Sequence, residues 1–334
     1  MTGKSGAQLR ELGPDDAVAV HAFVTVENAV RAHDAPWQHP DTPFRREMTM
    51  RHGWDGEVGR HFLWLAEGAP VGTVVVETSE WDNRDLAWLH VAIHPDHRRR
   101  GHGTAALEAA FDVARGMGRT LVGLDGWDSE RTTGFATATG FDLKSQSINR
   151  RQHLRELAPG LAEEVRDEAA RHAADYELLR LQGTSPDDLL EELAEVSAAI
   201  NDAPLDDLEL EDEVYTADRL RDYEAAQAAG GYRLYRVVAR HRGTGALAGH
   251  TAVAVDAERP ELGEQHDTAV ARQHRGHRLG ALVKADMMLW LAEAEPQLAT
   301  VDTWNAESND HMIRVNERLG YRVVARQLEF QRRI

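Results

Sequence analysis

Two turns rich in arginine and glycine are the stretches of this sequence best suited to bind an anion. The first, Arg98-Arg99-Arg100-Gly101-His102-Gly103, follows the apolar run Val91-Ala92-Ile93, and the second, Arg275-Gly276-His277-Arg278-Leu279-Gly280, follows Val270. Each turn precedes apolar residues at helical spacing, which predicts a strand, a turn and a helix start. Helix starts carry free N–H groups that attract anions, and glycine lets the backbone approach a bulky group. We therefore expect a phosphate or pyrophosphate ligand.

The elements that must position these turns occur twice in the same order. The first copy predicts strands at 71–77 and 88–93, a helix from Gly103 to Gly116, a strand at 121–124, a helix at 129–139 and a closing Gly140-Phe141. The second predicts strands at 232–240, 246–255 and 267–270, a helix at 279–293, a strand at 300–304, a helix at 309–319 and a closing Gly320-Tyr321. Ile93 and Val270 are 177 residues apart, and Phe141 and Tyr321 are 180 apart. This agreement predicts a tandem repeat of a whole α/β domain.

The length of 334 residues is also typical of two domains. We predict an N-terminal domain at 8–148, a charged helical connector at 149–174 and a C-terminal domain at 175–332. Amphipathic helical segments precede the strands of each copy: Asp16 to His33, Asp187 to Asn201 and Ala217 to Ala229.

Composition excludes several classes of function. The chain has no cysteine, which rules out disulfides, thiolate metal sites and a cysteine nucleophile. Its net charge of −18 argues against broad nucleic-acid binding and allows a small or cationic substrate. No long uncharged apolar run could span a membrane, and no secretory signal is visible, so we expect a cytoplasmic protein. The sequence does not indicate an oligomeric state.

The turns match neither GxxxxGK[ST] nor GxGxxG, so ATP or NAD is not held as in those folds. Arg98-x-x-Gly101-x-Gly103 after a strand resembles instead the acetyl-CoA loop of GNAT-type N-acetyltransferases. Arg275-x-x-Arg278-x-Gly280 is similar, but arginine replaces the first glycine. The resemblance implies a mixed sheet flanked by helices, two such domains in tandem, and acetyl-CoA or coenzyme A as the ligand.

The resemblance also implies the residues that contact the coenzyme. They are Val91, Ile93, Arg98, Arg99, Arg100, Gly101, His102, Gly103 and Thr104 in the first copy, and Val270, Arg275, Gly276, His277, Arg278, Leu279, Gly280 and Asn305 in the second. In such enzymes a backbone N–H near Ile93 or Val270 would hold the thioester carbonyl.

The family's later helix carries an asparagine beside the pantetheine arm and a tyrosine that can protonate the thiolate. Asn309 stands at that asparagine position in the second copy, but Asn316 replaces the tyrosine. The first copy has Ser129 and Ala136 at the two positions. Neither copy therefore retains the usual general acid.

Some members of the family carry a glutamate base six residues before the position held by Val270, and Glu264 stands there. Ala87 is its counterpart in the first copy, where His90 lies on the same strand. We therefore name Glu264, Asn309 and His90 as catalytic candidates, with His266 and Asp267 in reserve. For Glu264, the interpretation as a solvated carboxylate at a strand end is favoured over that of a base.

Four histidines, at 90, 94, 97 and 102, surround the first turn, but their spacing matches no metal-ligand pattern and the arginines would repel a cation. We expect no metal. Residues 33–37 and Trp304 could line an acceptor pocket or simply pack the domains.

From these observations we expect an acetyl-CoA-dependent N-acetyltransferase that acts on a primary amine of a small molecule or peptide by direct transfer. The alternative is a catalytically silent CoA-binding regulatory or interaction protein, because both tyrosines are missing.

Overall fold

The computed structural model describes residues 6–334, which divide into two compact units. Unit 1 combines the described residues up to Gln146 with Asp207–Glu211 and Gln327–Ile334, and unit 2 combines Ser147–Asp206 with Asp212–Arg326. Neither unit is one continuous segment. No helix among residues 6–334 is long and apolar enough to cross a membrane.

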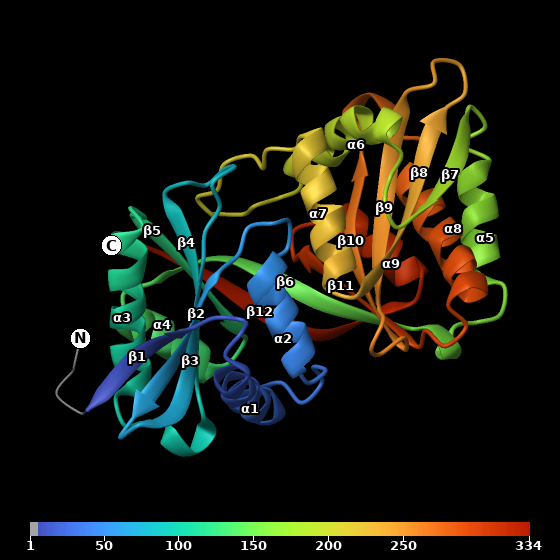
Figure 1. Ribbon diagram of the computed structural model, residues 1–334. Helices are drawn as coiled ribbons and strands as arrows, with labels where there is room; N and C mark the ends of the chain where they lie inside the picture. The colour runs from blue at the N-terminus through green and yellow to red at the C-terminus, as the bar shows by residue number, and fades with distance from the viewer. Residues whose placement is uncertain (1–5) are drawn as a thin grey trace. The chain divides into compact units, whose positions relative to one another are not determined.

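Unit 1 is built on a six-stranded sheet in the order β1-β2-β3-β4-β5-β12 (Figure 1). The strands are β1 (Ala7–Leu12), β2 (Arg60–Ala66), β3 (Ala69–Glu77), β4 (Leu86–Ile93), β5 (Leu121–Trp127) and the end of β12 (Tyr321–Arg333). Neighbours are antiparallel except β4 and β5, which are parallel. Residues 327–333 of β12 pair with β5, so the C-terminus of the chain completes this unit.

Helices cover both faces of the unit 1 sheet. They are α1 (Ala17–Asp34), α2 (Pro43–His52), α3 (His102–Gly116) and α4 (Glu130–Ala138), with a short 3-10 turn η1 (Pro95–His97). Leu107 and Phe111 of α3 are fully buried against β3 and β4, and each such side chain contributes about 1.5–3 kcal/mol to folding. Phe23 of α1 packs in a second cluster with Leu63 and Val75, on the other face.

The parallel strands β4 and β5 separate at the end that precedes α3. Their register runs from Leu86–Leu121 to Leu89–Leu124 and stops there. Beyond this point β4 pairs only with β3, up to Ile93, and β5 continues to Trp127 beside β12. A gap therefore opens in the sheet next to residues 94–103, which turn β4 into α3. We call this segment the elbow of unit 1, and residues 271–280 are the elbow of unit 2.

Unit 2 repeats this plan with the strand order β6-β11-β10-β9-β8-β7. The strands are β6 (Asp142–His153), β7 (Tyr176–Gln182), β8 (Tyr232–His241), β9 (Leu247–Asp256), β10 (Leu262–Val270) and β11 (Thr300–Ala306). The parallel pair β10 and β11 separates after Glu264 and Asp302. The predicted repeat and α/β class are thus confirmed.

The helices of unit 2 also lie on two faces. They are α5 (Leu161–Ala170), α6 (Leu190–Ser197), α7 (Ala217–Ala229), α8 (Leu279–Ala294) and α9 (Asp310–Arg318), with 3-10 turns η2 (Leu154–Glu156), η3 (Asp187–Leu189), η4 (Ala198–Asp202) and η5 (Arg272–His274). α6 and α7 pack on β9 and β8 with Leu193 at their centre, whereas α8 packs on the opposite face with Val283 in its core.

The stretch 149–174, expected as a helical connector, has a different structure. Residues up to His153 belong to β6, and 147–153 pair with β11. The residue pattern predicts no strand here because Asn149 to His153 are all polar, and only the backbone pairing with β11 makes them a strand. The helical part is α5, which belongs to unit 2 and packs on α8.

Candidate active site

The elbow of unit 1 turns β4 into α3 through two residues in the left-handed region. Arg99 has φ 59° and Gly101, the N-cap of α3, has φ 84°. No atom lies within 4 Å of a Cβ built on Gly101, and the residue is exposed. Space is therefore open beside the N-cap of α3, and the first N–H groups of a helix, which lack intrahelical partners, can bind an anion.

The side chain of His102 does not face this anion site. Its Nδ1 accepts a hydrogen bond from Trp64 Nε1 on β2 at 3.2 Å, and Trp64 is buried. The contribution expected from His102 is therefore limited to its backbone.

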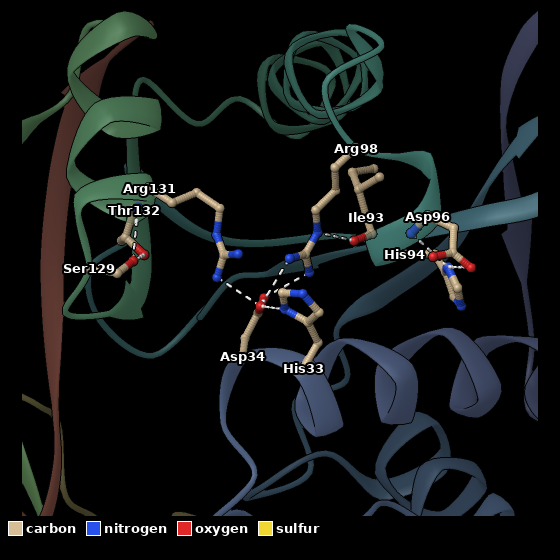
Figure 2. Close-up of polar contacts among 9 residues, drawn as sticks. All are labelled: His33, Asp34, Ile93, His94, Asp96, Arg98, Ser129, Arg131 and Thr132. Carbon is tan, nitrogen blue, oxygen red and sulfur yellow. Dashed lines mark hydrogen bonds and ion pairs between the residues drawn. The ribbon is translucent and has the colours of Figure 1, made fainter.

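Arg98 also differs from the expectation of a phosphate ligand (Figure 2). Its Nε donates to the Ile93 carbonyl at 2.8 Å, while Nη1 and Nη2 donate to Asp34 at 2.9 and 2.7 Å. The side chains of Arg98 and Asp34 are only 18% and 15% exposed. The spacing could not predict this pair because Asp34 lies 64 residues away, at the end of α1.

Asp34 has two further partners in Figure 2. Arg131 of α4 approaches its Oδ1 at 2.8 Å, and His33 Nδ1 lies 2.6 Å from the same oxygen. Burial opposes ionisation of this carboxyl, but the hydrogen bonds from Arg98 and His33 outweigh it and lower the pKa of Asp34. Asp34 is thus a fixed anion shared by α1, the elbow and α4.

The backbone of β4 points into the gap between the strands. His94 N–H donates to the Val71 carbonyl of β3 at 2.9 Å, and antiparallel pairing alternates the direction of successive residues. Val91 and Ile93 therefore direct their N–H groups away from β3, where β5 has already separated. These two groups have the position expected for donors to a thioester or its amide arm.

His90 lies at the start of the gap, between two carboxylates. Its Nε2 is 3.0 Å from Glu77 Oε2 on β3 and its Nδ1 is 3.2 Å from Asp125 Oδ1 on β5. Shielding from water disfavours the imidazolium, but the attraction to Asp125 and Glu77 prevails and raises the pKa of His90 well above its usual value. The raised pKa favours the imidazolium form at neutral pH, and this form donates a proton rather than accepts one.

The same face of the sheet carries an aromatic pair. Trp37, from the α1–α2 loop, meets Trp127 of β5 edge to face, with ring centroids 5.2 Å apart. Trp127 and Asp125 point to the same face because they are two residues apart on one strand. The 33–37 stretch thus contributes Trp37 to the region beside His90 and Asp34 to the elbow.

The elbow of unit 2 has the same backbone conformation, but glycine stands at the first left-handed position instead of the second. Gly276 has φ 86° and Arg278, the N-cap of α8, has φ 58°, so both left-handed positions recur. Arg275 Nε donates to the Val270 carbonyl at 3.1 Å and its Nη2 to Asp202 at 2.6 Å. The arginine that replaces glycine thus keeps the backbone conformation.

Glu264 is exposed at the last shared position of β10 and β11. A β-bulge follows it, between Gln265 and Thr268. Burial lowers the pKa of His266 to about 3 and raises the pKa of Asp267. Burial therefore favours the uncharged form of both reserve candidates. Tyr223, which the sequence analysis did not single out, shares a hydrogen bond with His266.

The asparagines of unit 2 have structural partners. Asn309 caps α9 by accepting the Met312 N–H at 3.2 Å, as Ser129 caps α4 by accepting the Thr132 N–H at 3.1 Å. Asn316 is fully buried and donates to Asn305 Oδ1 at 2.7 Å. Asn305, expected beside the coenzyme, therefore supports Asn316.

A buried lysine is a further titratable group that sequence reasoning missed. Lys284 of α8 donates to Gln265 Oε1 at 3.0 Å and lies 5.1 Å from the centre of the Tyr321 ring, beside a small cavity. Burial lowers its pKa to about 7. No cluster of metal-ligating side chains occurs among residues 6–334.

Two units with a split parallel strand pair and a strand–turn–helix elbow define a tandem GNAT fold. The fold matches a tandem GNAT protein from the clavulanic acid biosynthesis pathway with a TM-score of 0.81 and 24% identity, over 98% of each chain. It also matches a GCN5-related N-acetyltransferase from Sphaerobacter thermophilus, with a TM-score of 0.68 and 15% identity over 100% of this chain and 97% of the other.

The sequence supports the same assignment. The model of the Acetyltransferase (GNAT) family matches residues 26–141. A mycothiol acetyltransferase from Parafrankia is 30% identical over 116 residues, which are 34% of this chain and 33% of that protein. The chain thus matches only about a third of the length of this relative.

Proposed function

We propose that the protein transfers an acetyl group from acetyl-CoA directly to a primary amine of a small molecule or peptide, at the site of unit 1. The observation that carries this proposal is the juxtaposition in one unit of an open α3 N-terminus, capped by left-handed Gly101, and the gap after Leu89 of β4. Both lie in the segment that matches the family model.

The residues of unit 1 suit acetyl-CoA, which would supply the activated acetyl thioester. The backbone N–H groups of the elbow, from Arg99 to Thr104, would bind the pyrophosphate. The N–H groups of Val91 and Ile93 would hold the thioester end and its carbonyl oxygen. The side chain of Arg98 remains with Asp34 and is not needed as a ligand.

The amine would bind beside His90. Glu77, His90 and Asp125 together carry one net negative charge when the histidine is protonated, which attracts an alkylammonium group. A carboxylate of this cluster can accept the proton that the ammonium must lose before it attacks. Trp37 and Trp127 would contact the apolar part of the acceptor.

Paired variants test which unit performs the chemistry. Asp125→Asn keeps the size of the side chain but not its charge, and we expect the turnover number to fall by roughly 10²–10⁴-fold. Glu264→Gln in unit 2 should leave turnover near that of the wild type. Thiol release would be measured with a panel of amines, including the acceptor of the mycothiol acetyltransferases. The reverse pattern would move catalysis to unit 2, with Glu264 as base and Asn309 supporting its coenzyme.

A silent CoA-binding role is the second candidate. It is favoured by Ala136 and Asn316 at the two tyrosine positions, since neither side chain can protonate a thiolate. In that case calorimetry would detect CoA binding while no amine in the panel releases thiol.

A further inference from the structure

The side chain of Arg98 donates a hydrogen bond to β4 where the neighbouring strand β5 no longer does so. Ile93 directs its carbonyl into the gap, where β5 no longer offers a partner, and Arg98 Nε supplies that hydrogen bond at 2.8 Å. The Ile93 carbonyl thereby has a hydrogen-bond donor although the gap stays open, and the Ile93 N–H remains directed into the gap.

Asp34 fixes the arginine in this place. Nη1 and Nη2 of Arg98 both donate to the Asp34 carboxylate. Two parallel hydrogen bonds fix the plane of the guanidinium, which a single hydrogen bond would not do. Arg131 and His33 hold the carboxylate from other directions (Figure 2).

The same arrangement recurs in unit 2. Arg275 Nε donates to the Val270 carbonyl and Nη2 to Asp202, at the end of η4. Asp202 also binds Arg272. A strand carbonyl, an arginine and an aspartate after the helical lead-in thus form one device, built at both sheet gaps.

We propose that Asp34 is a positioning residue for the acetyl-CoA site: it holds Arg98, and through it the Ile93 backbone and the elbow, without touching the ligand. This inference rests on the proposed function of unit 1. Loss of Asp34 should loosen the backbone donors while the acceptor cluster at His90 stays in place.

Asp34→Ala should lower kcat/KM for acetyl-CoA by roughly 10²-fold, because a displacement of about 1 Å has that cost. KM for the amine should change little, and Asp34→Glu should restore part of the loss. Asp15→Ala is the control, since Asp15 forms an exposed ion pair with Arg51 at the other end of α1. Unchanged acetyl-CoA kinetics in Asp34→Ala would overturn the proposal.

Hydrogen exchange tests the same device without activity. Peptides covering 93–103 should exchange faster in Asp34→Ala than in wild type or Asp15→Ala, and equal protection would also overturn the proposal. A wild-type protein that neither binds nor uses acetyl-CoA would refute the proposed function instead. The exchange result would still test whether Asp34 holds the elbow backbone in place.

A second inference comes from different contacts, those of the unit 2 elbow. Arg278 donates to Glu168 of α5, which also binds Arg318 of α9. His274 Nδ1 lies 3.0 Å from the Tyr176 hydroxyl, and His277 Nδ1 lies 3.3 Å from the His172 carbonyl. The side chains of His274, His277 and Arg278 are thus held by the segment 168–176.

A carboxylate already occupies the neighbourhood of the α8 N-terminus. Both arginines lower the pKa of Glu168, with Arg318 the stronger, so it is ionised at neutral pH. α5 cannot leave easily, because Val165 and Ala169 are buried in the same cluster as α8. An incoming pyrophosphate would meet a like charge beside a guanidinium that is already paired.

We infer that the Glu168–Arg278 pair closes the second coenzyme site, so that the chain binds one CoA, in unit 1. Calorimetry should give one CoA per wild-type chain and none for Gly101→Glu. Adding Glu168→Gln and Arg278→Gly to Gly101→Glu should restore one binding event, whereas adding the control Glu164→Gln, an exposed change on α5, should not.

Two CoA sites in the wild type, or CoA binding to the single variant Gly101→Glu, would overturn the inference. It would also be overturned if the triple variant, with Glu168→Gln and Arg278→Gly added, showed a native circular dichroism spectrum but no CoA binding. Absence of binding in wild type would contradict the proposed function of unit 1 rather than this closure.

Discussion

At the scale of single residues, His90 of unit 1 lies between two carboxylates. Glu77 and Asp125 raise its pKa, so folding stabilises the imidazolium. The stabilisation is fully present below the unfolded pKa of about 6.5 and is lost as the pH rises through the folded pKa. NMR titration of the ring protons should therefore find His90 still charged at pH 7. Titration at about 6.5 in the wild type would contradict this, and Glu77→Gln should lower the folded pKa.

Lys284 is the opposite case, because burial lowers its pKa from 10.5 to about 7. The unfolded chain binds more protons than the folded one between these values, so this lysine weakens folding most at and below pH 7. Lys284→Met should raise the free energy of unfolding by on the order of 3 kcal/mol at pH 7, and the gain should vanish toward pH 10.5. Lys144→Met, a change near the surface, should show no such trend in denaturant melts.

At the scale of elements, the turn into α3 depends on backbone conformation. Gly101→Ala should lower the free energy of unfolding by about 1 kcal/mol, because alanine is strained at φ 84° although no atom is close. Gly134→Ala, inside α4, should raise it by about 0.5–1 kcal/mol, since alanine favours a helix and the space is open. Changes of the same sign in chemical denaturation would contradict this account.

The elbows show how one backbone tolerates two sequences. Arg99-Arg100-Gly101 and Gly276-His277-Arg278 both place the first and third residues in the left-handed region, and each uses glycine at only one of them. The conformation therefore belongs to the strand–turn–helix element rather than to one glycine. What differs is the side chain at the N-cap, which in unit 2 reaches Glu168.

At the scale of the whole molecule, unit 1 contains a strand from a distant part of the chain. Phe330 of β12 is 2% exposed in the core of unit 1, nearly 200 residues after α4 of that unit. Phe330→Ala should cost about 3–5 kcal/mol and expose β5 to hydrogen exchange, while the exposed Val323→Ala on the same strand should cost little. Normal protection of β5 in Phe330→Ala would show that unit 1 is stable without this side chain.

The sequence by itself determined the tandem repeat, the strand–turn–helix order around each turn and the two turns rich in arginine and glycine. These follow from local periodicity, from glycine placement and from a fixed offset between the copies, all of which a linear pattern records. The resemblance to GNAT enzymes rested on the same short-range features, and the tandem fold that it implied was confirmed.

Tertiary structure alone decided which side chains meet. Asp34 and Arg98, Asp125 and His90, and Glu168 and Arg278 are each far apart in sequence, so spacing cannot predict their pairing. The protonation of His90 and Lys284 depends on those neighbours and on burial, not on residue type. The strand at the end of β6 is polar throughout and forms because β11 offers backbone partners. Such contacts become visible only once the sheet has brought distant segments side by side.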